Sequence, residues 1–381
     1  MKIGFDVSQT GAGKAGCGYY ADGLIRALEG LESGHSVLLY PAFGDLFWDP
    51  LCATAAYSTS NPLFERMQAP ATFEESQRFW RQGTPEGPPD FEARIGSPDL
   101  VHSNNFFCPR GLRRARLVYT LHDLSFLVDP SWTTEANRAG CFDGVFGAAT
   151  RADWIVANSG YSRRHFLEVF PHYPAERTAV IYAGSRYRLE APAPPRPERL
   201  GPLAPEGFWL SVGSLEPRKN QRRLVEAYAR SGSRLPLVVA GGKGWLMDDF
   251  AKGPNLAGVV PAGYVADQEL EWLYRNCFAL VYPSLFEGFG MPVLEAMALG
   301  APVICSDTTS LPEVTGEAGI LVDPLDTEAI AAAMARLASG EIGREALRAA
   351  GLRQAQQFSW RASARKLLAV YEECVRREKA F

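Results

Sequence analysis

Long hydrophobic segments are lacking from this sequence. Its 381 residues contain no apolar run that approaches the roughly 18 residues needed for a membrane-spanning helix. Residues 1–8 alternate like a strand and show no basic region followed by an apolar segment, as a secretory signal would. We therefore expect neither a membrane anchor nor a leader, and any contact with a membrane would be peripheral.

An excess of charge and paired cysteines are lacking too. The chain has 39 Lys and Arg against 43 Asp and Glu, a formal net charge of -4, so no overall positive field recruits nucleic acid or anionic lipid. The seven cysteines are odd in number and form no C-x-x-C pair, which excludes a disulfide framework and a zinc ligand set. We expect a cytoplasmic protein without a nucleic acid partner.

The chain has a globular composition with one proline-rich interruption. Hydrophobic residues make up 46% of it and charged residues 22%, as in soluble globular proteins. At roughly 150 residues per domain, the length predicts two or three domains. Residues 191–206 are rich in proline, which removes hydrogen-bond donors and disfavours helix. We expect a stiff connector there, between a first domain at 1–190 and a second at 207–360.

Short apolar runs alternate with amphipathic helices after the connector. Strands buried on both faces read as continuous apolar runs, and the helices between them cover a parallel sheet. Residues 207–360 are therefore predicted to form a doubly wound α/β domain, and residues 1–190 follow the same pattern less regularly. Strands are predicted at 208–212, 235–240, 258–264, 278–282, 302–306 and 319–322, with helices at 221–230, 268–277, 292–299 and 327–338. In the first half, strands are predicted at 2–7, 36–40, 100–101, 117–121, 154–157 and 178–182, with a helix at 20–28.

Residues 41–97 show no periodicity and are predicted to form a long loop region. Long loops in compact domains are commonly functional. The rings in this region could stack on the sugar faces of an acceptor, or they could fill the core. The aromatic residues here are Phe47, Trp48, Tyr57, Phe64, Phe73, Phe79 and Trp80.

A glycine-rich segment, Gly11–Gly16, follows the first predicted strand. It matches G-x-G-x-x-G, the pattern that binds dinucleotides between a strand and a helix. The match is imperfect, because the next strand ends at Tyr40 and not at an acidic residue that could hold a ribose. An NAD-dependent oxidoreductase is one alternative. Otherwise Gly16 and Gly18 let the backbone approach a phosphate or sugar, or the glycines form a tight surface turn.

The segment Pro283–Glu295 carries two glutamates after a predicted strand. Glu287 lies in a loop with glycines, and Glu295 is expected in the first turn of a helix that begins at Pro292. Ligands of open α/β sheets bind at the carboxyl ends of strands, and carboxylates accept hydrogen bonds from hydroxyl groups. A sugar or a ribose would therefore suit this loop. Alternatively, Glu295 complements the helix dipole and Glu287 is a solvated acid.

Two more polar segments follow predicted strands. Arg218 and Lys219 lie at a strand-to-helix junction, where two cations can neutralise a diphosphate, although they could equally form a solvated surface. His122 and Asp123 follow the strand at 117–121. A single histidine is more often structural, but a His–Asp pair at a strand end can orient a reacting group.

Together these segments resemble the retaining glycosyltransferases of family 4. The resemblance rests on the E-x7-E element within PSLFEGFGMPVLEAMALGAPVICSD, and on VGSLEPRKN, TLHDLSF, ANSGYSRR and LPEVTGEAGILVDP, in the family's order. It implies the GT-B architecture, in which two Rossmann-like, doubly wound domains face each other across an active-site cleft. It also implies that residues 1–190 form the acceptor side, that residues 207–360 bind the nucleotide sugar, and that the C-terminal helix, about 361–381, packs back on the first domain.

The resemblance implies a role for each matching residue. Glu287 would contact the hydroxyls of the donor sugar, and Glu295 would hold the ribose of the nucleotide. Lys219 would pair with the diphosphate, with Arg218 nearby, while Ser214 stands where many members have an arginine. The catalytic group would be completed by His122 and Asp123 near the anomeric carbon. The other donor-binding residues would be Gly16, Gly18, Gly241, Gly242, Tyr264, Gly288, Phe289, Gly290 and Met291.

The implied reaction moves a hexose, with retention of configuration, from a nucleotide diphosphate sugar to a saccharide or lipid-linked saccharide acceptor. The segments SLEPRKN and EGFGMPVLE are similar to bacterial mannosyltransferases of polysaccharide assembly, such as that of lipopolysaccharide, which favours GDP-mannose. No D-x-D sequence is present to bridge a metal to the diphosphate, so we expect no metal and no cofactor. The enzyme would work in the cytoplasm, with peripheral contact at the inner face of the membrane. Besides the oxidoreductase, a non-catalytic sugar-nucleotide-binding protein remains an alternative.

Overall fold

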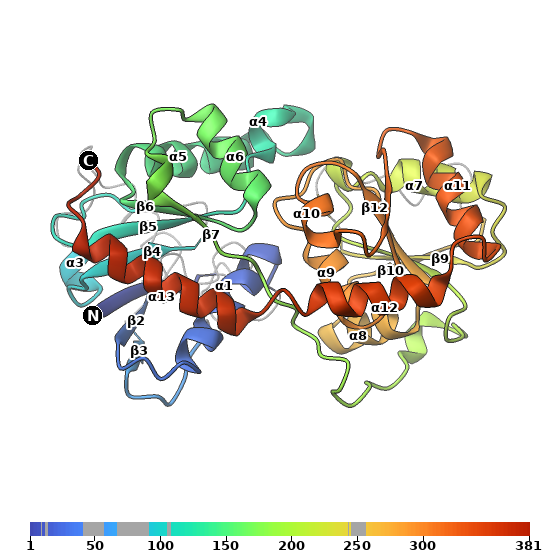
Figure 1. The fold of residues 1–381 in the computed structure, drawn as a ribbon, viewed down its shortest axis with the longest axis horizontal. Helices are drawn as coiled ribbons and strands as arrows, with labels where there is room; N and C mark the ends of the chain where they lie inside the picture. The colour runs from blue at the N-terminus through green and yellow to red at the C-terminus, as the bar shows by residue number, and fades with distance from the viewer. Residues whose placement is uncertain are drawn as a thin grey trace. The chain divides into compact units, whose positions relative to one another are not determined.

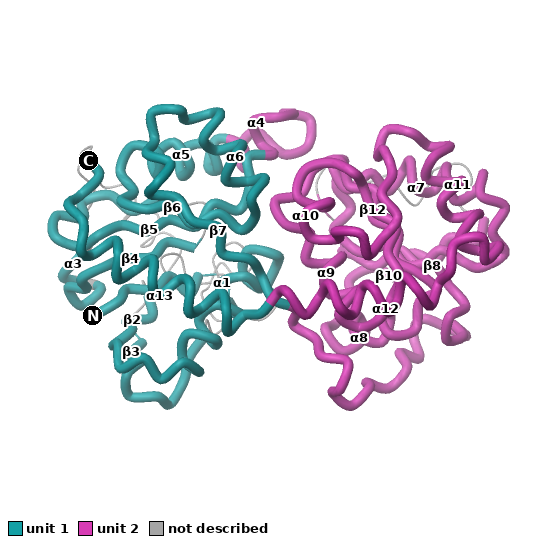
Figure 2. The backbone as a smooth tube through the Cα atoms, in the orientation of Figure 1, with its two compact units in different colours: residues 1–124, 139–184, 359–381 teal, residues 125–138, 185–358 magenta. Residues whose placement is uncertain are grey.

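The structure is a computed structural model that describes residues 1–8, 10–11, 14–40, 57–66, 91–104, 108–242, 244 and 257–381. The chain divides into two compact units (Figure 2). Unit 1 consists of Met1–Leu124, Ala139–Gly184 and Ser359–Phe381, and unit 2 consists of Ser125–Arg138 and Ser185–Phe358. No helix in the part of the chain described is long and apolar enough to cross a membrane.

Unit 1 is built on a seven-stranded sheet whose strand pairs are parallel (Figure 1). The strand order β3-β2-β1-β4-β5-β6-β7 places the first strand inside the sheet, between β2 and β4. Phe5 of β1 accordingly lies opposite Leu39 on one side and His102 on the other. This is the order of Rossmann-like folds, which bind ligands where the strand order reverses. The strands are β1 (Lys2–Asp6), β2 (Ser36–Tyr40), β3 (Phe64–Arg66), β4 (Leu100–Ser103), β5 (Arg116–Leu121), β6 (Trp154–Ala157) and β7 (Thr178–Val180).

The last helix, α13 (Trp360–Arg376), lies in unit 1 and packs against α1 (Gly16–Glu29). Trp360 lies against two glycines, and an added Cβ would come within 2.5 Å of its indole at Gly23 and 2.7 Å at Gly184. The Ser363 hydroxyl donates a hydrogen bond to the Tyr182 carbonyl at 2.7 Å. The Trp360 indole can therefore approach this closely only because Gly23 and Gly184 have no side chains. The other described helices before the connector are α3 (Phe91–Arg94), α4 (Ser125–Val128), α5 (Glu135–Arg151) and α6 (Gly160–Val169).

Unit 2 repeats this topology with a parallel sheet of six strands in the order β10-β9-β8-β11-β12-β13. Its first strand, β8, again lies inside the sheet, where the strand order reverses toward β11. The strands are β8 (Trp209–Val212), β9 (Leu237–Ala240), β10 (Val259–Gly263), β11 (Ala279–Tyr282), β12 (Val303–Ser306) and β13 (Ile320–Val322). The helices are α7 (Gln221–Arg230), α8 (Asp267–Asn276), α9 (Met291–Ala298), α10 (Leu311–Thr315), α11 (Thr327–Ala338) and α12 (Arg344–Ala355).

Alternate strand residues of unit 2 form a core with α7 and α11. Leu237 and Val239 of β9 share a buried cluster with Leu224 of α7 and Met334 of α11. Burying a side chain of this size stabilises a fold by about 1.5–3 kcal/mol. The core thus fixes the strand ends from which the loops of the sheet edge project.

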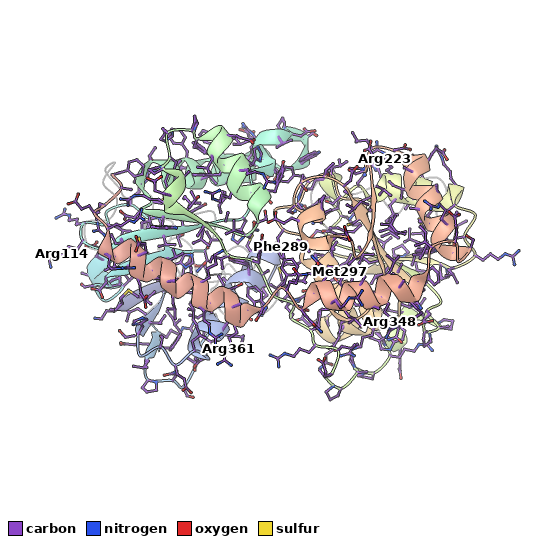
Figure 3. The ribbon with its side chains drawn as sticks, in the orientation of Figure 1. Arg114, Arg223, Phe289, Met297, Arg348 and Arg361 are labelled. Carbon is purple, nitrogen blue, oxygen red and sulfur yellow. The ribbon has the colours of Figure 1, made fainter. Side chains whose placement is uncertain are left out.

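Helices α9 and α12 pack against each other in unit 2. Met297 of α9 and Arg348 of α12 are labelled in Figure 3. Gly351 gives Met297 its space, since a Cβ there would lie 3.3 Å from the Met297 Cγ. This contact anchors α9, the helix that carries Glu295.

The unit boundaries differ from the predicted domains at two places. Unit 2 begins at Ser185, before the connector, because Arg275 of α8 donates hydrogen bonds to the carbonyls of Arg188 and Leu189 at 2.8 and 2.9 Å. Residues 125–138 also belong to unit 2, where the Trp132 ring lies 6.1 Å from that of Phe286.

The predicted loop region 41–97 contains short elements that its sequence does not reveal. These are β3 and α3, and their three and four residues are too few to show a period. The sequence also gave no prediction for α5, α6, α10 and α12. The connector itself contains one turn of 3-10 helix, Glu198–Leu200.

Candidate functional site in unit 2

Loops from four neighbouring strands meet at the carboxyl edge of the second sheet. Gly213 follows β8 and Gly241 follows β9, and the two backbones touch so closely that a Cβ on Gly241 would lie 1.9 Å from the Gly213 oxygen. Gly213 has a φ of 140°, which favours glycine. Tyr264 follows β10 and is 64% exposed, and a Cβ on Gly242 would lie 3.8 Å from its Cβ. The structure thus brings Gly241, Gly242 and Tyr264, three of the predicted donor-binding residues, to one edge.

Glu287 is the centre of a buried hydrogen-bonded cluster at this edge. Its Oε1 atom lies 2.7 Å from the Lys219 Nζ, 2.8 Å from the Tyr282 hydroxyl and 2.6 Å from the Ser284 hydroxyl. Lys219 also donates to the Tyr282 oxygen at 2.7 Å. Arg218 lies 3.4 Å from the same Oε1. Among the described residues, every hydrogen bond to this carboxylate therefore converges on one oxygen.

The charges in this cluster fix the protonation state of Glu287. Burial alone would raise the pKa of Glu287, but the charges of Lys219 and Arg218 and the hydrogen bonds from Lys219 and Ser284 lower it to about 2. The pKa of Lys219 is lowered, first by burial and then by the charge of Arg218, against the opposing effect of Glu287. Glu287 is therefore an ionised acceptor at neutral pH.

The loop that carries Glu287 is held by its neighbours on both sides. The Leu285 amide donates to the Arg218 carbonyl at 2.7 Å, which ties this loop to the one after β8. The Ser310 hydroxyl donates to the Glu287 carbonyl at 2.9 Å. The Phe289 ring, labelled in Figure 3, packs edge-on against Phe358 at 5.8 Å. Its side chain therefore packs in the core of unit 2.

Helix α9 begins directly after this loop. Gly288 and Gly290 are buried, and Gly290 is the N-cap with a φ of 104°, in the region that favours glycine. Met291, the first residue of the helix, is half-buried. The helix starts one residue earlier than predicted, so Glu295 lies in its second turn and not in its first. The alternative in which Glu295 merely complements the helix N-terminus is therefore weakened.

Glu295 has a cation partner that the sequence analysis missed. Its oxygens lie 2.5 Å from the Arg186 Nε and 3.0 Å from the Arg186 Nη2, a side-on pair in which Glu295 is 1% exposed. No motif points to Arg186, which lies 109 positions away. Tyr282 and Ser284 were missed as well, although their place just before Glu287 could have indicated them.

Ser214 contributes its backbone to the loop after β8. Its side chain is exposed, and its carbonyl accepts a hydrogen bond from the Gln221 Nε2 at 2.9 Å. Arg218 is balanced by Glu216 at 3.3 Å as well as by Glu287. The cationic pair predicted for a diphosphate is thus matched by two carboxylates.

The predicted residues His122 and Asp123 belong to unit 1, after β5. The His122 Nε2 lies 2.7 Å from the Asn104 carbonyl, which can only accept, so this nitrogen carries the proton. The Ser162 hydroxyl donates to the His122 carbonyl at 3.1 Å. Burial lowers the pKa of His122, against the opposing effects of its hydrogen bond to the Asn104 carbonyl and of the charge of Asp123. His122 is therefore a neutral imidazole, and Asp123 beside it is half-buried.

A buried polar chain links the partner of His122 to the last helix. The Thr120 hydroxyl donates to the Asn104 Oδ1 at 3.0 Å and lies 2.8 Å from the His102 Nε2. The other ring nitrogen of His102 lies 2.5 Å from the Tyr371 hydroxyl of α13. Burial lowers the pKa of His102 to about 3, so this ring stays neutral. This series of hydrogen bonds holds the side chain of Asn104, and the Asn104 carbonyl in turn holds the ring of His122.

The remaining predicted residues of unit 1 lie at the start of α1. Gly16 is exposed with no atom within 4 Å of an added Cβ, whereas Gly18 is buried. Part of the segment Gly11–Gly16 lies outside the described residues. Of the aromatic group, Tyr57 and Phe64 are buried and belong to the core, and Phe47, Trp48, Phe73, Phe79 and Trp80 lie outside the described residues. Among the residues described, no three His, Cys, Asp or Glu side chains gather as metal ligands.

Two Rossmann-like sheets with loops of this kind define a GT-B type protein, and comparisons with known proteins agree. Residues 198–354 match the family model "Glycosyl transferases group 1", and residues 15–185 match "Glycosyltransferase Family 4". The O-antigen chain mannosyltransferase B of Escherichia coli is 38% identical over 272 residues, which cover 68% of this chain and 71% of that protein. The chain belongs to glycosyltransferase family 4 and is a glycosyltransferase.

Two further proteins place this assignment in context. The serotype-specific mannosyltransferase WbdA of Escherichia coli is 28% identical over 77% of this chain, which spans only 39% of that longer protein. The sucrose-phosphate synthase of Thermosynechococcus elongatus superposes with a TM-score of 0.74 over 98% of both chains at 23% identity, and this likeness concerns the fold alone. The predicted GT-B fold class is confirmed. The family assignment also decides against the two alternative interpretations of the sequence, an NAD-dependent oxidoreductase and a non-catalytic sugar-nucleotide-binding protein.

Proposed function

We propose that this glycosyltransferase moves mannose from GDP-mannose, with retention and without a metal, to a saccharide or lipid-linked saccharide acceptor. The observation that carries the proposal is the arrangement around Glu287, an ionised carboxylate with two cations at the edge of the second sheet. Mannose is favoured because two relatives are mannosyltransferases, one of them acting on an O-antigen chain.

In this proposal the second oxygen of Glu287 accepts a hydroxyl of the donor sugar. Lys219, Tyr282 and Ser284 all bond to Oε1, so the proposal assigns the lone pairs of Oε2 to the ligand. The ionised state of Glu287 strengthens this hydrogen bond, because bonds to charged groups are about twice as strong as neutral ones. The amides of Gly288, Phe289 and Gly290 are assigned to the same sugar on the basis of the family resemblance.

Lys219 binds the diphosphate of the donor in this mechanism. Two of its three N–H donors go to Glu287 and Tyr282, and the third is assigned to a phosphate oxygen. The N-terminus of α9 supplies a further partial positive charge. These groups stabilise the negative charge that grows on the leaving phosphate, so the chain's own residues perform the role that a metal has in other transferases.

The transfer itself exchanges one bond at the anomeric carbon. The bond from this carbon to the phosphate oxygen breaks, and the acceptor oxygen bonds to the same face of the sugar. The acceptor proton goes to the departing phosphate oxygen, so no protein base is consumed. Neutral His122, with Asp123 beside it, is assigned to the donor sugar near the anomeric carbon, and Glu295 is assigned to the ribose.

The proposed compartment is the cytoplasm, with peripheral contact at the inner membrane face for a lipid-linked acceptor. Cysteines are expected to stay reduced there, and the six that the structure describes are free thiols.

A donor screen tests the proposed function. GDP-mannose, UDP-glucose and their free nucleotides are compared by thermal shift and by release of nucleotide, with Glu287→Gln and the exposed-site control Glu328→Gln. A ligand at 100 times its Kd stabilises by about 2.7 kcal/mol, which a melting curve resolves. We expect GDP-mannose to stabilise wild type and the control but to be turned over far more slowly by Glu287→Gln. A flat response to every nucleotide sugar would refute the proposal, and activity lost to a chelator and restored by Mg²⁺ would refute its metal-free part.

A further inference from the structure

Arg186 binds three carboxylate oxygens at the edge of unit 2. Besides its side-on pair with Glu295, its Nη1 atom lies 3.0 Å from an oxygen of Asp267. The side chain of Arg186 is 17% exposed and its guanidinium lies 4.9 Å from the centre of the Tyr187 ring. The Tyr187 hydroxyl in turn donates to the Asp267 carbonyl at 3.1 Å. The guanidinium is thus fixed on both sides before any ligand is considered.

We propose that Arg186 is a positioning residue that makes Glu295 a ribose acceptor. The inference rests on the proposed function, in which Glu295 holds the ribose of the donor nucleotide. A carboxylate has about four lone-pair sites, and a side-on arginine takes one on each oxygen. The site that remains on each oxygen points away from the guanidinium, and the two sites diverge to opposite edges of the group, so one of them is available to accept the 2′-hydroxyl of the ribose.

The side-on geometry explains what Arg186 adds to Glu295. Its two parallel N–H bonds, at 2.5 and 3.0 Å, keep the buried carboxylate from turning about its last bond. A lysine would supply the charge but only a single contact point. The pair therefore differs in kind from the exposed pair of Arg230 and Glu328 in the same unit.

The test measures the preference of the protein for ribose over deoxyribose. Titration calorimetry compares GDP with 2′-deoxy-GDP, and UDP with 2′-deoxy-UDP, on wild type, Arg186→Gln, Arg186→Lys and the matched control Arg230→Gln. A hydrogen bond to a charged group corresponds to roughly a 10- to 100-fold preference for the ribose form. We expect this preference in wild type and Arg230→Gln, a reduced one in Arg186→Lys, and a ratio near one in Arg186→Gln. The affinity for the deoxy nucleotide should change little across the set, which a general loss of structure would not allow.

Each other outcome has its own meaning. Wild type that binds none of the four nucleotides overturns the proposed function and the inference with it. Wild type that binds a pair without preference leaves Glu295 with no ribose contact and overturns the inference alone. The inference is also overturned if both Arg186 variants keep the wild-type preference, or if Arg186→Gln binds GDP more tightly, which would make Arg186 a competitor of the ribose. Should Arg186→Gln fail to fold, Arg186→Lys retains the charge, and a reduced preference for the ribose form in that variant tests the inference.

Discussion

Replacing Glu287 by glutamine should change how the stability of unit 2 depends on pH. The pKa of Glu287 falls from an ordinary value of 4.5 to about 2 on folding. At roughly 1.4 kcal/mol for each pH unit, this difference contributes about 3 kcal/mol to the free energy of unfolding. Because the folded-state pKa is the lower one, the contribution is complete above pH 4.5 and is lost as the pH falls from 4.5 toward 2. Glutamine cannot ionise, so the variant lacks this contribution at every pH.

The assay is urea unfolding of wild type and Glu287→Gln at pH 6, 4 and 2.5. The free energy of unfolding is taken from the transition whose urea midpoint the substitution shifts. The stability difference between the two proteins should be about 3 kcal/mol at pH 6 and should largely vanish at the lowest pH. Glu328→Gln serves as the matched control, because exposed pairs such as Arg230–Glu328 contribute about 0–1 kcal/mol. A difference that stays constant from pH 6 to pH 2.5 would show that Lys219 and Arg218 do not hold Glu287 in its ionised form.

Two further predictions concern unit 1. Gly23→Ala should lower stability by about 1–3 kcal/mol because its Cβ would lie 2.5 Å from the Trp360 indole, whereas Gly16→Ala, with nothing within 4 Å, should not; equal melting temperatures for the two variants would contradict the contact. Since burial lowers the pKa of His122, the imidazole is already neutral at pH 6.5, so kcat/KM should show no ionisation of His122 between pH 6.5 and 8. A change of kcat/KM with pH in this range that is absent from His122→Gln would show that the His122 ring titrates, and would contradict this prediction.

The sequence predicted the second unit well because its strands are buried on both faces. Such strands appear as continuous apolar runs, and Gln221–Arg230 carries so clear a helical period that α7 has the predicted ends. Strand β3 shows the limit of this signal, because only Phe64 of its three residues is buried. Residues 125–138 lie in unit 2, where the Trp132 ring contacts that of Phe286, and no local pattern in the sequence contains such a contact.

The site residues were predicted in separate motifs, and the structure shows which of their side chains contact one another. Lys219 and Glu287 are 68 positions apart and come together because β8 and β11 are neighbours in the sheet. Their motifs place both residues at strand ends, but strand order decides whether two such ends touch. Arg186 was missed because it belongs to no motif, although it comes four residues after the strand predicted at 178–182, and only its contact with Glu295 indicates a role for it.

The two glutamates of the E-x7-E element have different surroundings, and this difference separates their chemistry. The donors to Glu287 in the described part of the chain, a lysine, a tyrosine and a serine, all bond to one oxygen, and the proposed mechanism assigns its second oxygen to the ligand. Glu295 shares both oxygens with one guanidinium, which fixes the plane of the carboxylate and leaves one outward acceptor site on each oxygen. In the proposed function, the acceptor on Glu287 serves a hydroxyl of the donor sugar, and the acceptor on Glu295 serves a hydroxyl of the ribose. Substitution at Glu287 should therefore affect sugar transfer, while substitution at Glu295 or Arg186 should affect nucleotide binding.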